Sequence, residues 1–277
     1  AVPAPSLGSP ALRATRMSLP VVEHRAEILQ SIAEHQVVIV EGETGCGKTT
    51  QVPQYIVEHA AETSTPCSVV CTQPRRISAI SVADRVANER GEPLGNSVGY
   101  SVRLESKTGP STCLLFCTTG ILLRRMEADP DLQGTTHVVV DEVHERGVES
   151  DFLLLALRDL CVRKPTIKVV LMSATMDKDL FGRYFGGAPA LSVPGRTFPV
   201  ETFYAEHALQ ATGHVLSPAA EWSVSASKGK GKGKGLDNSD RENLDAPKRE
   251  ELTVAAVKSR YGAFTATAQA SLVNWEQ

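Results

Sequence analysis

Short apolar runs alternate with helical stretches between residues 36 and 185, and this alternation limits most strongly what the chain can fold into. We expect strands at 36–40, 68–72, 113–117, 137–140 and 168–172. We expect helices at 48–60, 77–90, 120–127, 151–162 and 177–185. Near-continuous apolar strands separated by helices are typical of a parallel sheet that is covered on both faces. The sequence therefore predicts an α/β domain with a mostly parallel, doubly wound sheet and helices on both faces.

A glycine-rich segment, GETGCGKT, joins the first expected strand to the first expected helix and matches the pattern G-x-x-x-x-G-K-[ST]. Glycines let backbone N–H groups turn toward phosphate oxygens, and the helix N-terminus that follows favours anions. In this pattern the lysine, Lys48, reaches the β- and γ-phosphates, and the hydroxyl of Thr49 binds Mg²⁺. We therefore predict an ATP and Mg²⁺ site. Its expected nucleotide-binding residues are Gly42, Glu43, Thr44, Gly45, Cys46, Gly47, Lys48, Thr49 and Thr50.

Two adjacent carboxylates, Asp141 and Glu142, follow the apolar run 137–140 directly. The glycine-rich segment is a phosphate-binding loop (P-loop), and the strand before it is 36–40. A second Mg²⁺-binding group is needed at the end of a strand next to this one, and a carboxylate there can supply it. Asp141 is expected to bind the metal through water, and Glu142 to orient and polarise the attacking water. Together with Lys48 they form the predicted catalytic set. The alternative, an ordinary surface pair, is disfavoured because the two residues come directly after a buried strand.

The motifs GETGCGKT, TQPRR, TTG, DEVH and SAT occur in this order. As a set they resemble superfamily-2 helicases of the DEAH/RHA group. Longer stretches at 72–91, 98–105 and 141–154 are especially similar to that group, and the resemblance extends from about residue 19 to about residue 206. DEVH stands where DEAH is usual, and we expect this small change to be tolerated. The resemblance implies a RecA-like P-loop NTPase fold and an RNA-translocating motor driven by ATP.

The resemblance also implies roles for residues outside the P-loop. Arg85 resembles the arginine that stacks on the nucleotide base, and a planar guanidinium suits stacking; a plain helix-surface arginine is the alternative. Residues similar to those that link the ATP site to strand movement are His144, Ser173, Ala174 and Thr175. Residues matched to nucleic-acid contacts are Gln73, Pro74, Arg75, Arg76, Arg103, Thr118, Thr119 and Gly120.

The expected nucleic-acid contacts use guanidinium, hydroxyl and N–H donors, which suit phosphate oxygens and carry little sequence information. For Arg75 and Arg76 the alternative is a solvated basic corner, and for Arg103 it is an exposed salt bridge. The formal net charge of −3 and the isoelectric point near 6.2 give no argument for nucleic acid, so a local set of donors must bind it.

The cysteines and the hydropathy pattern indicate where the chain works. Six cysteines are present, four of them in two C-x-x-x-C pairs. Both pairs lie in apolar, strand-like runs, so buried, reduced thiols are favoured over a zinc site. Such thiols fit a reducing compartment, the cytoplasm or the nucleus. No run of 18 apolar residues occurs, so we predict no membrane span.

The chain divides by composition into four expected parts. Residues 1–18 are rich in Ala, Pro and Ser and are expected to be disordered, with a transit peptide as the alternative. Residues 19–204 form the expected first RecA-like domain. Residues 205–250 contain KGKGKGKG and are expected to be a flexible insert. Residues 251–277 are expected to be a short tail or the start of a truncated second motor domain.

The resemblance also implies a partner domain. Helicases of this group hydrolyse ATP between two RecA-like domains, and the second domain supplies an arginine finger in a segment like Q-x-x-G-R-A-G-R. No such segment occurs in this chain, so we expect a fragment whose second RecA-like domain lies in cis. The leading hypothesis is an RNA helicase motor domain. The alternatives are an ATP-dependent RNA-binding module without unwinding activity and a DNA helicase domain.

Overall fold

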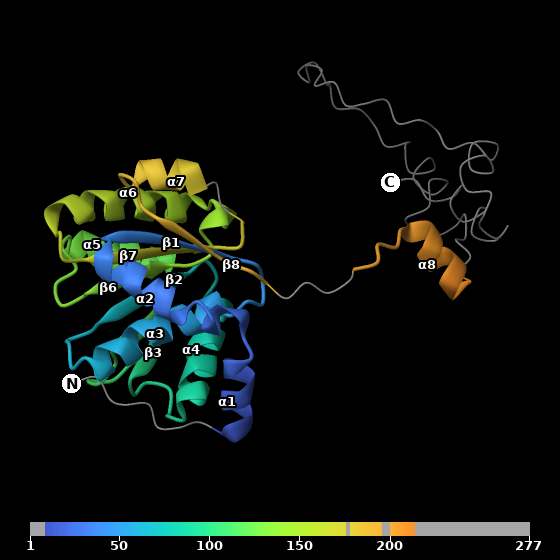
Figure 1. Cartoon of the computed structure of the whole chain (residues 1–277), viewed down its shortest axis with the longest axis horizontal. Coiled ribbons are helices and arrows are strands. Elements are labelled where there is room, and N and C mark those ends of the chain that lie inside the picture. The colour runs from blue at the N-terminus through green and yellow to red at the C-terminus, as the bar shows by residue number, and fades with distance from the viewer. Residues whose placement is uncertain (1–8, 176–177, 196–199, 214–277) are drawn as a thin grey trace, which may run out of the picture. The chain divides into compact units, whose positions relative to one another are not determined.

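A sheet of eight strands runs through the computed structural model of the chain, which describes residues 9–175, 178–195 and 200–213 (Figure 1). Across the sheet the strands are β4 (Glu105–Lys107), β3 (Val98–Val102), β5 (Leu114–Thr118), β2 (Val69–Gln73), β6 (His137–Val140), β7 (Lys168–Ser173), β1 (Val37–Gly42) and β8 (Ala190–Val193). All neighbouring strands are parallel except β3 and β4, which pair antiparallel. The predicted mostly parallel α/β sheet is therefore confirmed.

Helices cover both faces of this sheet, as the view in Figure 1 shows. One face carries α2 (Arg25–Glu34), α3 (Lys48–Glu62) and α4 (Arg76–Arg90). The other face carries α5 (Thr119–Ala128), α6 (Val148–Arg163) and α7 (Lys178–Tyr184). The described residues also form α1 (Pro10–Met17), α8 (Ala205–Thr212) and the 3-10 turns η1 (Pro20–Val22) and η2 (Val143–Glu145).

Strand β1 shows why the apolar runs are nearly continuous. Val38 and Val40 pack into the core layer beneath α2, α3 and α4. Val37 and Ile39, which alternate with them, pack into the layer beneath α5, α6 and α7. Because successive side chains of a strand point to opposite faces, a strand buried on both sides must be apolar at every position.

The ten elements expected between residues 36 and 185 are all present, with ends shifted by only a few residues. The structure adds elements that the apolar pattern does not reveal. Strand β4 is exposed at all three positions, and β8 at the opposite edge is buried only at Val193. Helix α2 turns only Ile28, Ser31 and Ile32 into the core. The apolar spacing of Ile77, Ile80 and Val86 predicts that these three residues share the inner face of α4. Val86 is buried, but Ile77 is 79% exposed, so the prediction is wrong for Ile77.

The expected disorder of residues 1–18 is wrong for residues 10–17, which form α1. The side chain of Ser9 accepts a hydrogen bond from the backbone N–H of Leu12 and so caps this helix. Arg16 at its other end pairs with Glu58 of α3, which fixes α1 against the domain. A composition rich in Ala, Pro and Ser indicates disorder because it does not reveal the long-range contacts of Arg16 with Glu58 and Gln51. Residues 1–8 lie outside the described residues.

The chain divides into two units, Ala1–Thr197 and Phe198–Gln277, so the first unit ends before the expected boundary at 204. In the second unit, α8 occupies residues 205–212, which were expected to open the flexible insert. Tyr204 and His207 form a capping box at its N-terminus. The rest of the expected insert and the expected tail at 251–277 lie outside the described residues.

Cysteine burial agrees with the expected core thiols at three positions. Cys46, Cys71 and Cys117 are buried, whereas Cys67, Cys113 and Cys161 are half-buried, and all six are free thiols. Burial raises the pKa of Cys117 to about 12 and that of Cys161 to about 11, so these thiols stay protonated near neutral pH. Among the helices of the described ranges, none has the length and apolar character to cross a membrane.

Candidate active site

The loop between β1 and α3 depends on its glycines. Gly45 and Gly47 have φ of +83° and +97°, in the left-handed region that favours glycine. A Cβ on Gly45 would meet no atom within 4 Å, so glycine serves the backbone conformation there. A Cβ on Gly47 would lie only 2.9 Å from Cδ1 of Leu19, so glycine is also required for packing. The loop therefore has the turned backbone that a phosphate-binding loop needs.

The turn η1 supports this loop from the protein side. The backbone N–H of Val21 donates to the carbonyl of Cys46 at 3.1 Å, and the Cys46 side chain is buried. A Cβ on Gly42 would lie 2.7 Å from Sγ of that cysteine, which explains a third glycine. Glu43, Thr44 and Gly45 are exposed, so the outer rim of the loop is accessible to a ligand.

Lys48, Thr49 and Asp141 meet although they come from different parts of the chain. Lys48 and Thr49 begin α3, and Asp141 follows β6. Lys48 and Asp141 are each only 4% exposed. Burial raises the pKa of Asp141, and the hydrogen bonds of Gln73 and Thr49 and the charge of Lys48 offset only part of that rise. A buried carboxylate beside a hydroxyl is a hard-oxygen donor set of the kind that Mg²⁺ prefers.

The route by which Asp141 reaches the P-loop differs from the expected one. We expected its strand to lie next to the P-loop strand, but β7 separates β6 from β1. Because all three strands are parallel, their carboxyl ends still meet at one edge of the sheet. The site is therefore assembled across three strands, and the carboxyl end of the middle strand contributes Ser173.

Gln73 occupies a position that the sequence misassigned. Its side chain was expected to contact nucleic acid, but the residue is only 2% exposed. Its Nε2 donates to Oδ2 of Asp141 at 2.7 Å, while the backbone N–H of Glu142 donates to Oδ1 at 2.9 Å. Gln73 therefore holds the metal-binding candidate in place. The expected role is wrong for its side chain because the strand end turns that side chain inward.

The residues expected to couple the site to movement are brought together. Oγ of Ser173 lies 3.2 Å from Nδ1 of His144, and the backbone nitrogen of Ala174 lies 3.4 Å from the same atom. Oε2 of Glu142 lies 3.4 Å from the same Nδ1. Glu142 has φ of +54°, a strained conformation for a residue with a side chain. His144 thus lies within 3.4 Å of both the carboxylate of Glu142 and the hydroxyl of Ser173 at the end of β7. Thr175 beyond it is exposed.

The expected nucleic-acid residues lie at the same carboxyl edge of the sheet. Arg75 and Arg76 follow β2, Arg103 follows β3, and Thr118 ends β5, all parallel strands. The three arginines are exposed, and the first two pair with Glu145 and Glu105, respectively, at 3.1 and 3.9 Å. Such exposed pairs contribute little stability, so these guanidinium groups can exchange partners.

Three other members of the expected nucleic-acid set are less accessible. Pro74 and Gly120 are half-buried. Thr119 is only 4% exposed, and its contact with nucleic acid stays a prediction. It is the first residue of α5, directly after β5.

Arg85 lies on α4 with 43% of its side chain exposed. Its Nε donates to Oε1 of Glu89, one turn further along the helix, at 2.7 Å. Glu89 is buried and also accepts hydrogen bonds from Gln51 and Gln54 of α3. Sequence reasoning missed Gln51 and Glu89 because they belong to no motif; only their polar character at positions that face the core signals a role.

The chain is similar to known helicases. The family model described as DEAD/DEAH box helicase matches residues 23–181, more than half of the chain. The chain is 57% identical to the DExH-box ATP-dependent RNA helicase DExH3 of Arabidopsis thaliana over 73% of its own length. It is 44% identical to DExH1 of the same plant over 96% of its length, and 52% identical to the human putative ATP-dependent RNA helicase DHX57 over 75%.

These three relatives are much longer than this chain, whose matched part spans 17%, 26% and 15% of their lengths, respectively. The family match includes the P-loop, Asp141, Glu142 and His144, which the structure brings to one edge of the sheet. The family match over residues 23–181 shows that the chain belongs to the DEAD/DEAH box helicase family.

Proposed function

We propose that this chain is the ATP-hydrolysing first motor domain of an RNA helicase. One observation carries the proposal: the P-loop, the two acidic residues, the SAT segment and the exposed arginines all follow parallel strands of one sheet at their carboxyl ends. In open α/β sheets this edge is where ligands bind. A single edge that holds both an NTP site and a row of cations suits a protein that couples nucleotide turnover to nucleic-acid movement.

ATP with Mg²⁺ is the cofactor that the donor set supports. Lys48 supplies a positive charge for the β- and γ-phosphates, and the loop supplies backbone N–H donors. The hydroxyl of Thr49 and the buried carboxylate of Asp141 would hold Mg²⁺, which polarises the phosphates when bound. Gln73 and the N–H of Glu142 occupy one lone-pair direction on each oxygen of Asp141, so they fix its orientation.

Glu142 is the residue that we assign to the attacking water. Its carboxylate is half-buried at the end of β6, where a positive φ turns its backbone away from the strand direction. From this position it would accept a proton from the water and align it for attack. His144 is 3.4 Å from Oε2 of Glu142 and 3.2 Å from Oγ of Ser173. A nucleic-acid strand that displaces the SAT segment (173–175) would therefore also shift Glu142, through His144.

RNA is the proposed nucleic-acid substrate, and the names of the relatives and the exposed arginines support this proposal. Arg75, Arg76 and Arg103 present guanidinium groups, which bind phosphate oxygens bidentately. They form a local cationic row although the formal net charge of the chain is −3. Contacts of this kind read the backbone and not the bases. We therefore propose binding that is largely independent of sequence and that weakens steeply with salt.

A second RecA-like domain in cis is the proposed partner of the site. The relatives compared above are about four to seven times longer than the part that this chain matches. The rim of the P-loop is exposed at Glu43, Thr44 and Gly45, which leaves room for a residue from another domain. An arginine finger supplied there typically accelerates hydrolysis by about 10³ to 10⁵, so we expect slow turnover from this chain alone.

The test compares the chain with its Glu142→Gln variant in Mg²⁺. Both are expected to bind ATP with equal affinity in calorimetry. RNA-stimulated hydrolysis, measured as phosphate release, should fall by about 100-fold or more in the variant, because the water loses its base. Arg158→Gln on the outer face of α6, where Arg158 pairs with Asp159, is the matched control and should leave both quantities unchanged.

Two results would contradict the proposal. Equal turnover in the chain and the Glu142→Gln variant would remove Glu142 as the water-orienting residue. Stimulation by single-stranded DNA that exceeds stimulation by RNA of the same sequence would replace RNA as the substrate. ATP binding without any turnover, even at high enzyme concentration, would favour the alternative of an ATP-dependent binding module.

A further inference from the structure

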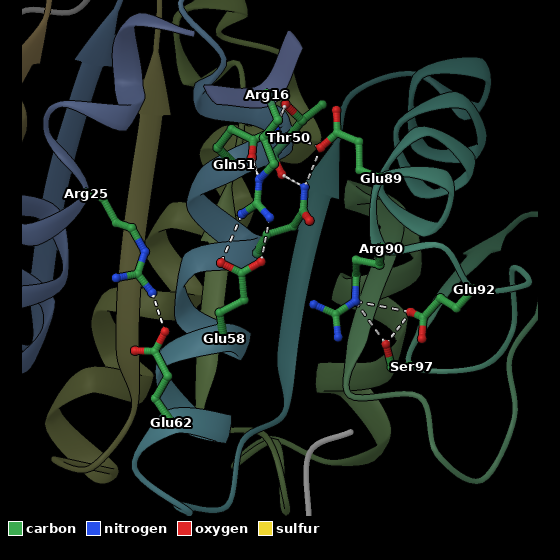
Figure 2. A network of polar contacts seen from close by, with 11 residues as sticks. Arg16, Arg25, Thr50, Gln51, Glu58, Glu62, Glu89, Arg90, Glu92 and Ser97 are labelled. Atoms are coloured by element: carbon green, nitrogen blue, oxygen red, sulfur yellow. Dashed lines mark hydrogen bonds and ion pairs between the residues drawn. The ribbon is translucent and has the colours of Figure 1, made fainter. Parts of the chain in front are cut away.

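Arg16 of α1 contacts two side chains of α3, Gln51 and Glu58 (Figure 2). Its Nη2 donates to Oε2 of Glu58 at 2.9 Å, its Nη1 lies 2.8 Å from Oε1 of the same carboxylate, and its Nε donates to Oε1 of Gln51 at 2.5 Å. Burial lowers the pKa of Arg16, but the carboxylate of Glu58 more than offsets this. The guanidinium is therefore a permanent donor that contacts two residues about two turns apart on the same face of α3.

The contact with Gln51 decides which way its amide group points. A guanidinium has donors and no acceptor, so Gln51 must turn its oxygen toward Arg16. Its Nε2 consequently faces away from Arg16, where it donates to Oε2 of Glu89 at 2.9 Å and to Oγ1 of Thr50 at 2.8 Å. Gln51 is fully buried, and it contacts Arg16 through its oxygen and Glu89 through its nitrogen (Figure 2). An amide turned the other way would place its oxygen against a carboxylate.

Glu89 passes this orientation on to Arg85. The Glu89 side chain is only 1% exposed, so its charge needs every donor around it. Oε2 accepts from Gln51 and from Gln54, at 2.9 and 2.8 Å, while Oε1 accepts from Nε of Arg85 at 2.7 Å. The two glutamine donors thus fix the plane of the carboxylate. That plane sets the direction in which Arg85 presents its guanidinium.

The same contacts lie next to the phosphate-binding loop. Thr50, which receives a hydrogen bond from Gln51, donates from Oγ1 to the carbonyl of Gly47 at 3.3 Å. The backbone N–H of Gln51 donates to that carbonyl as well, at 2.9 Å. The first turn of α3 is therefore anchored with or without the side-chain contacts. This separates the two halves of the nucleotide site: the phosphate half rests on backbone bonds, whereas Arg85 depends on the buried side chains.

We propose that Arg16 is a positioning residue for nucleotide binding: by fixing the amide of Gln51 and through it the carboxylate of Glu89, the docked helix α1 holds Arg85 in the orientation that stacks on the base. The proposal rests on the proposed function and on the role that the resemblance implies for Arg85, stacking on the nucleotide base. The segment before the RecA-like core is then part of the nucleotide site, and undocking of α1 weakens nucleotide binding without altering the P-loop.

The test measures the affinity of the chain for ADP and for inorganic pyrophosphate, both with Mg²⁺, by calorimetry. Pyrophosphate engages only the phosphate half of the site. Arg16→Ala is expected to weaken ADP binding about 5- to 10-fold, a usual size for coupling through a contact network. Pyrophosphate binding should stay within about 2-fold of the unmodified chain, because backbone bonds hold the first turn of α3.

Arg25→Ala is the matched control. Arg25 also pairs with a glutamate of α3, Glu62, at 2.9 Å, and lies over the ring of Tyr55 as Arg16 does. Figure 2 shows this pair beside the Arg16 contacts but without a link to Gln51. Its removal should change neither affinity. Arg16→Ala in an Arg85→Ala background should cause no further loss of ADP affinity, because the end point of the chain of contacts is gone.

Three results overturn the inference: unchanged ADP affinity in Arg16→Ala, equal losses for ADP and pyrophosphate, or a full additional loss in the Arg85→Ala background. If Arg16→Ala gives no cooperative melting curve, Arg16→Lys decides the matter. Lysine keeps the charge beside Glu58 but lacks the Nε donor to Gln51, so the ADP defect should persist in a folded protein, and normal ADP affinity overturns the inference. Failure of the unmodified chain to bind either ligand instead refutes the proposed function.

Discussion

Both ends of the parallel strands carry polar residues, but the contacts of these residues differ between the two ends. At the amino end, side chains contact backbone carbonyls: Lys164 Nζ donates to the carbonyls of Asp131, Leu132 and Thr135 at 3.0 to 3.1 Å. Lys168 Nζ donates to two more, and Gln36 to another two. These contacts satisfy loop backbone that would otherwise lack partners, which is a structural task.

At the carboxyl end, side chains mainly contact other side chains. Gln73 holds Asp141, and His144 lies beside both Glu142 and Ser173. Such contacts orient a few reactive atoms and cost stability when a charge is buried, as at Asp141. The comparison teaches that polarity alone does not mark a site in this fold. The group that a polar side chain contacts distinguishes the two cases. Side chains that contact backbone carbonyls stabilise the fold, and side chains that contact other reactive side chains orient them for a ligand.

The largest expected effect separates the two ends through a pair of lysines. Lys48→Ala should weaken ADP binding by about 100-fold, because a charged donor to phosphate contributes about 3 kcal/mol. The thermal stability of the Lys48→Ala variant should stay near that of the unmodified chain. Lys164→Ala at the other end should do the reverse, with normal ADP affinity and a free energy of unfolding lowered by about 1 to 2 kcal/mol. Equal ADP affinity in both variants would break the comparison.

The sequence predicts most of the site residues at the carboxyl end of the strands, but few of the residues that hold them in place. The apolar runs predict the strands because a doubly buried strand must be apolar throughout, and the P-loop, Asp141 and His144 follow from motifs. The inward turn of Gln73 did not follow, because a strand end can direct a side chain either way. Arg16 and Glu89 were missed for another reason: their contacts join residues 35 or more positions apart, which no local pattern encodes.

A second pair of variants compares glutamines at the two ends. Gln73→Leu removes a donor from the buried carboxylate of Asp141 and should lower the free energy of unfolding by about 2 kcal/mol. It should also weaken ADP binding in Mg²⁺ but not in a chelator, because the metal ligand is no longer held. Gln36→Leu, which loses donors to the carbonyls of Cys161 and Lys164, should destabilise by a similar amount. A Mg²⁺-dependent loss of ADP affinity in Gln36→Leu, or no such loss in Gln73→Leu, would contradict the difference between the two ends of the strands.

The smallest expected effect concerns pH and the amino end alone. Burial and, to a lesser degree, the charge of Lys168 lower the pKa of His137 to about 4, well below its unfolded value near 6.5. Between these values the unfolded chain binds the proton and the folded chain does not, so stability falls as the pH drops through this window and is unaffected above it. His137→Gln should remove about 1 to 2 kcal/mol of the loss between pH 7 and pH 5 in denaturant titrations. Because His137 touches no part of the carboxyl edge, ADP affinity at pH 7 should not change. Parallel pH profiles for the variant and the unmodified chain would show that the histidine titrates normally, and that the amino end is more open to water than its contacts with backbone indicate.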